Sequence, residues 1–194
     1  MIPKFGIKAV VIILIAVVVT AALGWAYSEH RKRQLHEAVV GLVKDTSLRL
    51  RDALRIPASP PLADNPQAGR KFDDHVATVE RHLLKLRGMD TASLGALAEP
   101  ADDFVLTGRE ILRRVAASHR YRVQLSGSLQ ALRDHMRADD RSGSWVQEAV
   151  RAKERVEEDY RNYRLSVEAL GKLLESFPAS RAKMAPYVDA ALLT

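Results

Sequence analysis

The sequence contains no cysteine, and aromatic residues make up only 6% of its 194 positions. Without a thiol the chain cannot form a disulfide, a thiolate nucleophile, an iron–sulfur cluster or a cysteine-ligated zinc site. A helical bundle of this size can bury enough apolar surface without disulfides on either side of a membrane. The absence of cysteine therefore limits the chemistry of the protein but does not assign its compartment.

Motifs of the common enzyme classes are also missing. The glycines are scattered singly, so the sequence has no phosphate-binding loop, no dinucleotide fingerprint and no Gly-x-Ser-x-Gly elbow. The sequence also lacks a strand-rich half that could carry such motifs. We therefore expect a protein that is not an enzyme and that binds no cofactor.

The excess of positive charge is small. Thirty Lys and Arg residues against 24 Asp and Glu residues give a formal net charge of +6. Without Lys4 and Lys8 the remainder is still only mildly basic, well below the charge of a typical nucleic-acid-binding domain. Nucleic acid is therefore not an expected partner.

Six histidines raise the question of a metal site, and Asp74, His75 and His82 form the best cluster in the sequence. Residues seven apart share one face of a helix, so the two histidines could converge. However, there is no His-Glu-x-x-His motif and no pair of Glu-x-x-His motifs. We interpret these histidines as solvated or capping residues and expect no metal.

The one long apolar run lies near the N terminus. Residues 9–27 read AVVIILIAVVVTAALGWAY without a charged side chain, and a helix of that length comes close to the ~30 Å of a bilayer core. The run predicts a short tail and membrane anchor over residues 1–27, in contact with the lipid bilayer. Its apolar body includes Ile13, Leu14 and Val18, and Trp25 and Tyr27 lie where aromatic rings prefer the headgroup layer. The alternative is a cleaved signal peptide, although the run is longer than a usual signal core.

The charges that flank the run hardly distinguish its two orientations. The amino terminus, Lys4 and Lys8 stand on one side, and Arg31, Lys32 and Arg33 on the other. Because the start resembles a signal sequence and long domains are translocated largely regardless of charge, an extracytoplasmic domain on a cell (inner) membrane is slightly favoured over a cytoplasmic one.

Residues 28–194 are predicted to form one soluble helical domain. The run from Ser28 to Arg55 has no helix breaker, and a proline-rich connection follows at 57–69. A second helix is expected at about 70–87. Apolar residues repeat at helical spacing in both segments: Leu35, Val39, Leu42, Thr46 and Leu50 in the first, and Phe72, Val76, Val79, Leu83 and Leu86 in the second.

Two further long helices are expected, at about 101–136 and from Ser144 to a stop at Pro178. The first would bury Phe104, Ile111, Leu112, Val115, Leu125, Leu129, Leu132 and Met136. The second has the strongest pattern in the chain, with alternating spacings of three and four: Lys153, Val156, Tyr160, Tyr163, Val167, Leu170, Leu174 and Phe177. A last segment from about 180 to 193 offers Met184, Val188 and Leu192. The fold class predicted is therefore all-α, with one N-terminal transmembrane helix that continues into an elongated antiparallel bundle of about four long helices.

The third predicted helix carries an excess of arginine. Seven arginines stand beside only Glu110 and Asp134, and the candidate partner-binding residues are Arg109, Arg113, Arg120, Arg133 and Arg137. They could form a docking face for an acidic partner or an anionic lipid. The alternative, which we favour, is a solvated face that pairs with acids of the fourth helix, such as Glu154, Glu157 and Asp159.

The function that these features favour is that of a non-catalytic, single-pass membrane protein that serves as an accessory or scaffold subunit of an integral membrane protein complex. A homo-oligomer is possible, although the apolar run has no Gly-x-x-x-Gly face that would indicate helix dimerisation. The alternative is a ligand-sensing bundle. In architecture alone the chain resembles the four-helix sensory domains of bacterial chemoreceptors, which implies a ligand pocket between the helices. The sequence has no second apolar run, so on that interpretation a signal would pass through a partner.

Overall fold

The computed structural model describes residues 7–55, 66–137 and 143–193, with the side chains of residues 7–13, Pro66 and Ala190 outside the described set. Within these residues the protein is all-α, as predicted, and contains no strand. The elements are the long helices α1 (Ile7–Arg55), α3 (Pro66–Arg87), α5 (Ala98–Arg137) and α6 (Trp145–Met184), the short helix α4 (Thr91–Leu94), and the 3-10 helices η1 (Gly95–Leu97) and η2 (Ala190–Leu192).

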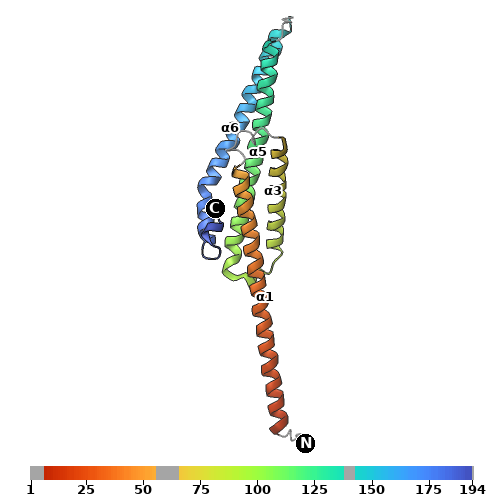
Figure 1. Cartoon of the computed structure of the whole chain (residues 1–194), viewed down its shortest axis with the longest axis vertical. Helices are drawn as coiled ribbons and strands as arrows, with labels where there is room; N and C mark the ends of the chain where they lie inside the picture. The colour runs from red at the N-terminus through yellow and green to blue at the C-terminus, as the bar shows by residue number, and fades with distance from the viewer. Residues whose placement is uncertain (1–6, 56–65, 138–142, 194) are drawn as a thin grey trace.

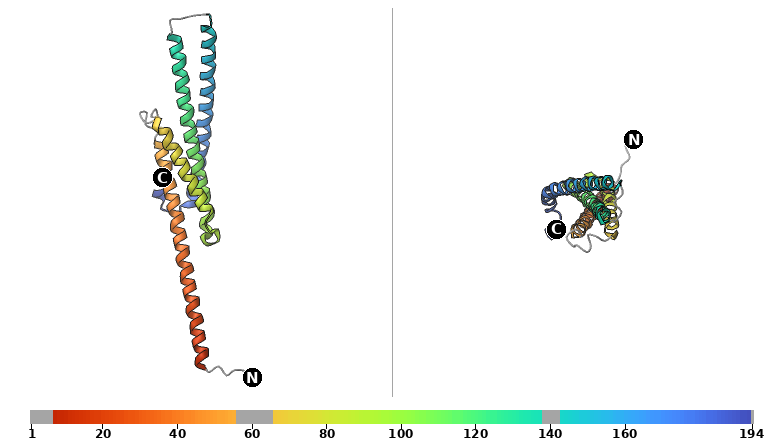
Figure 2. Two further views of the ribbon diagram at one scale, coloured as in Figure 1. Left: turned by 90° about the vertical axis from the view of Figure 1, so that its right-hand side faces the viewer. Right: turned by 90° about the horizontal axis from the view of Figure 1, so that it is seen from above.

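The molecule is elongated, and its helices are staggered along the long axis (Figure 1). The first part of α1 projects alone from one end, and the paired halves of α5 and α6 project from the other end (Figures 1 and 2). All four long helices run side by side only in the middle. We call this middle part the bundle region, and we call residues 117–137 of α5 together with residues 143–168 of α6 the arm.

The hydrophobic core is confined to the bundle region. The predicted stripe of α1 is buried or half-buried there, and so is that of α3, with Phe72 and Val79 almost completely enclosed. On α5 the fully buried apolar residues end at Ala116. The C-terminal segment closes the core through Met184, Val188 and Leu193, whereas the predicted Leu192 is exposed. The core therefore occupies only the middle part of the molecule.

A glycine allows α1 and α5 to approach each other closely inside the bundle region. A Cβ atom on Gly108 would lie 2.9 Å from Cγ2 of Thr46 and 3.2 Å from Cδ1 of Leu50. Those two residues belong to the apolar stripe of α1, so the stripe packs directly on the backbone of α5.

Two predicted helix boundaries were wrong. Helix α3 begins at Pro66 and not near residue 70, because proline is well tolerated in the first turn, where its missing N–H has no partner to lose. Helix α6 continues through Pro178 to Met184 and does not stop there. The turn after Pro178 is held in place from outside the helix, because Ser180 Oγ and Lys183 Nζ both donate to Asp103 Oδ2, at 2.9 Å and 3.0 Å.

In the described part of the chain, no helix is both long and apolar enough to cross a membrane. The structure therefore does not support the predicted transmembrane helix. That prediction starts at Ala9 and includes Ile13, whose side chain lies outside the described residues.

Candidate functional site

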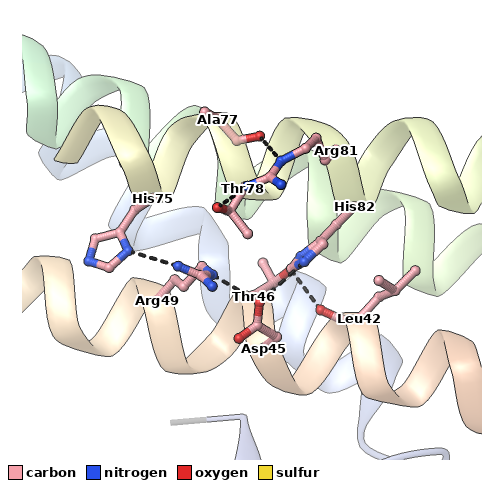
Figure 3. Close-up of polar contacts among 9 residues, drawn as sticks. All are labelled: Leu42, Asp45, Thr46, Arg49, His75, Ala77, Thr78, Arg81 and His82. Carbon is pink, nitrogen blue, oxygen red and sulfur yellow. Dashed lines mark hydrogen bonds and ion pairs between the residues drawn. The ribbon is translucent and has the colours of Figure 1, made fainter. Parts of the chain in front are cut away.

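A chain of polar contacts joins α1 to α3 across one side of the bundle region (Figure 3). Asp45 Oδ2 accepts a hydrogen bond from Arg49 Nε at 2.9 Å and lies 3.2 Å from Nε2 of His82. Arg49 Nη1 reaches Nδ1 of His75 at 3.3 Å, and His82 Nδ1 lies 3.2 Å from the hydroxyl of Thr46. The two histidines of α3 are therefore each held by residues of α1.

The burial of these histidines disfavours their charged forms. Desolvation lowers the pKa of His75, and the neighbouring Arg49 lowers it further. For His82 desolvation is again the largest cause, and it outweighs the attraction of Asp45, so the pKa of His82 is also lowered. Arg49 can donate to His75 Nδ1 only while that nitrogen is unprotonated, so the geometry agrees with a neutral ring.

The contacts of His75 and His82 with α1 hold two helices together and do not form a site for chemistry. Among the described residues, no group of three or more His, Asp and Glu side chains is placed to hold a metal ion. His75 and His82 turn toward α1 while Asp74 is exposed, so the three residues considered from sequence do not converge. The hydrogen bonds instead fix the register of α3 against α1.

The five candidate arginines of α5 do not share one face. At about 100° per residue, Arg109, Arg113 and Arg120 point within about 40° of one another, whereas Arg133 and Arg137 point to a different side. Arg113 Nη2 donates to Glu80 Oε1 of α3 at 2.6 Å, and Arg133 Nη1 donates to Gln130 Oε1. The expected pairing with acids of the fourth helix is replaced here by pairing with α3 and within α5.

The arm has a polar seam between its two helices. Asp159 of α6 is buried and accepts a hydrogen bond from Gln124 Nε2 at 2.6 Å, and the Ser128 hydroxyl lies against its other oxygen. Ser118 and Ser166 face each other with 2.8 Å between their hydroxyl oxygens. No fully buried apolar side chain is found among the described residues of the arm.

The predicted apolar stripes of α5 and α6 are consequently turned partly outward. Leu129 and Met136 on α5 are 44% and 52% exposed, and Tyr160 and Val167 on α6 are 55% and 42% exposed. Val156, Tyr163, Leu170 and Phe177 are half-buried, and the ring of Phe177 packs on Phe104 of α5, whereas the buried residues of α6 in the arm are Asp159 and Ser166. The repeated small polar residues of α5, Ser118 and Ser128 above all, were the signal that could have indicated this seam.

Two hollows elsewhere on the described surface are small. One of about 200 Å³ is lined by residues of α3, α4 and α5, including Leu86, Leu94 and Ala98. Another of about 210 Å³ lies beside Pro178 and Leu193. Pockets for drug-sized ligands usually measure about 300–1,000 Å³, so neither hollow favours a ligand site.

Comparison with known proteins gives no relative: no family model, no curated protein and no solved structure matches this chain.

Proposed function

We propose that this protein is a non-catalytic, single-pass membrane protein that acts as an accessory or scaffold subunit of a membrane protein complex. Its N-terminal helix anchors it, and its bundle carries an arm that reaches away from the anchor. The observation that carries the proposal is the exposed apolar start of α1.

The first part of α1 is apolar on every side. Leu14, Ile15, Val17, Val18, Val19 and Leu23 are each between 51% and 66% exposed. At about 100° per residue, Leu14, Ile15, Val17 and Val19 alone point in directions spread around the helix axis. A helix that is apolar all round needs an apolar environment on all sides, as a bilayer or the interior of an assembly provides. Trp25 and Tyr27, 71% and 70% exposed, come at the end of this segment, which suits the headgroup layer.

The remainder of the chain supports a binding role more than a catalytic one. The polar clusters described above are satisfied within the protein, since each connects one helix to another. The elongated shape and the uncovered apolar residues of the arm suit a protein that contacts others along its length.

The test is co-purification of the intact chain from its native membrane in mild detergent, followed by mass spectrometry and native sizing. We expect the chain to sediment with membranes and to elute with one integral membrane partner at fixed stoichiometry. Purification as a lone chain or as a homo-oligomer would contradict the subunit role, and recovery in the soluble fraction would contradict the anchor.

The side of the membrane on which the bundle lies can be measured separately. The natural chain has no cysteine, so Gln147→Cys, at an exposed position of α6, introduces a unique thiol. We propose an extracytoplasmic domain and expect an impermeant maleimide to label this thiol in intact cells, after permeabilisation of any outer membrane. Labelling only after lysis would place the domain in the cytoplasm.

A further inference from the structure

We infer that one side of the arm is a docking face for an acidic amphipathic helix of another protein. The face consists of Leu129 and Met136 of α5 together with Val146, Tyr160 and Val167 of α6. This inference rests on the proposed function, because it names the surface through which the subunit would contact its partner.

The five apolar residues lie on the same side of the helix pair. Each follows directly after a residue of the seam: Leu129 after Ser128, Met136 after His135, Val146 after Trp145, Tyr160 after Asp159, and Val167 after Ser166. In an antiparallel pair of right-handed helices, the positions that follow the inner seam residues of both helices point to one common side. The outward-turned apolar residues therefore form one face and are not scattered around the arm.

This face continues a surface that is already used for packing. On α5, Gly108, Val115, Leu129 and Met136 are separated by multiples of seven residues and so lie along one row of the helix. Gly108 and Val115, which belong to the bundle region, are buried, and Gly108 faces Thr46 and Leu50 of α1. Helices α1 and α3 reach only as far as residues 55 and 66 at that end, and the row continues without cover into the arm (Figure 2).

The pattern of α6 supports a third helix on the same side. A helix in the core of a bundle has a wider apolar stripe than one in a two-helix pair, because it contacts two neighbours. Tyr160, Val167 and Leu174 widen the α6 stripe in just that way, toward the uncovered side. Within the arm this second neighbour is missing, and an added amphipathic helix would complete the layer that α1 and α3 form in the bundle region.

The charges around the face favour an acidic occupant. Among the described residues, the cations Arg122, Arg133, Lys153 and Arg164 stand on this side of the arm, together with the acids Glu157 and Glu168. Glu157 already pairs with Lys153 at 3.4 Å, and Arg164 pairs with Glu168 along α6. A second copy of this chain would bring the same positive surface against itself, so an acidic helix of another protein fits better.

The position of the arm argues against a lipid surface as the occupant. The arm lies at the opposite end of the molecule from the apolar start of α1 (Figure 1). If the bilayer holds α1 as far as Tyr27, residues 28–55 of this helix place the arm about 42 Å or more from the bilayer. A protein that reaches out from the same membrane, or from beyond it, can meet the arm at that distance.

Photocrosslinking in native membranes tests this assignment. A photoreactive phenylalanine analogue replaces Tyr160 in one full-length chain and Leu165 in a matched chain; Leu165 is 52% exposed and lies on the other side of α6. We expect the chain labelled at position 160 to crosslink to a net-acidic, amphipathic helical segment of another protein, identified by sequencing the linked peptide. The chain labelled at position 165 should give about a tenth of that yield or less. An adduct with a second copy, an adduct with lipid, equal yields or no adduct would each overturn the proposal.

A pair of substitutions provides a second measurement. Tyr160→Gln combined with Val167→Gln should reduce the co-purified partner about tenfold or more, whereas Leu165→Gln should leave it unchanged. The unfolding temperature should be the same for the unaltered chain, the double variant and the Leu165→Gln variant, because the substituted side chains are already exposed. Undiminished partner recovery from the double variant would mean that the face is wrong while the subunit role stands. If the unaltered chain recovers no partner, the proposed function itself fails.

Discussion

Helices α5 and α6 run through both the bundle region and the arm, yet the two regions are stabilised in different ways. In the bundle region α5 buries Phe104, Ile111 and Leu112 completely against its neighbours. In the arm the ring of His119 still packs on Phe72 of α3, but beyond it α5 is paired with α6, and the buried residues are Ser128, Asp159 and Ser166. The difference shows that a single amphipathic helix can bury its apolar stripe along one part of its length and leave the stripe exposed along another.

The number of neighbouring helices explains this difference. A helix with neighbours on two or three sides can bury a wide stripe, and each buried large side chain contributes about 1.5–3 kcal/mol. A helix in an isolated pair buries only a narrow seam, which hydrogen bonds such as that of Gln124 to Asp159 can fill at little cost in stability. We therefore expect the arm to be the less stable part of the molecule.

The largest expected effect comes from truncating one aromatic residue in each region. Phe104→Ala removes a fully buried ring that packs against Phe177 with 5.4 Å between ring centroids, and should lower the free energy of unfolding by about 3–5 kcal/mol. Tyr160→Ala in the arm should change it by less than about 0.5 kcal/mol. Urea denaturation of the full chain, followed by circular dichroism, measures both. Equal losses would refute the contrast between the two regions.

The next effect concerns the two glycines of α5. Gly108→Ala adds a methyl group 2.9 Å from Thr46, whose hydroxyl is held by the Leu42 carbonyl at 2.8 Å, so we expect a loss of about 1–3 kcal/mol. Gly127→Ala is the matched control in the arm, because nothing lies within 4 Å of the added atom. The control should gain up to about 1 kcal/mol from helix propensity. A stabilising Gly108→Ala would show that α1 and α5 are not closely packed there.

A smaller effect on stability is expected from a substitution that gives the arm a buried apolar side chain like those of the bundle region. Asp159→Leu replaces a buried carboxylate between the arm helices by an apolar side chain of similar size, and we expect a gain of about 1 kcal/mol. Amide hydrogen exchange of residues 117–137 and 145–166 measures this gain locally. Slower exchange in the arm with unchanged exchange in α3 is the expected pattern; faster exchange would mean that the Asp159 hydrogen bonds are needed to hold the pair together.

The smallest effect is a dependence on pH that belongs to the bundle region. The folded-state pKa values of His75 and His82 are lowered, so the unfolded chain binds more protons as pH falls below about 6.5. Stability should therefore decrease as pH falls through this range and level off below the folded-state values. Thermal unfolding from pH 8 to pH 5 should show this decrease, and the double variant His75→Gln and His82→Gln should show less of it. An identical pH profile for the two chains would contradict the assignment.

Much of the fold was predictable because it depends on local patterns. The all-α class, the continuous first helix and the core faces of α1 and α3 follow from helical spacing and from the absence of breakers. The candidate site was less predictable. The five arginines were grouped by their place in the sequence, although the helical period already separates their directions, and the contact of Arg113 with Glu80 of α3 depends on the packing.

The sequence by itself determined that this protein is helical, which residues on each helix are apolar, and that its N-terminal segment is apolar all round, because these are properties of composition and of a period of 3.6 residues. Only the tertiary structure decided how far each stripe is covered. The seam of the arm contains Asp159 and Ser166 rather than Tyr160 and Val167, and Pro178 lies inside a helix whose next turn is held by Asp103. The physical reason is that the spacing of apolar residues shows which side of a helix can be buried, whereas burial itself requires a neighbouring helix on that side. Because α1 and α3 are staggered relative to α5 and α6, neither of them covers the outward-turned apolar residues of the arm.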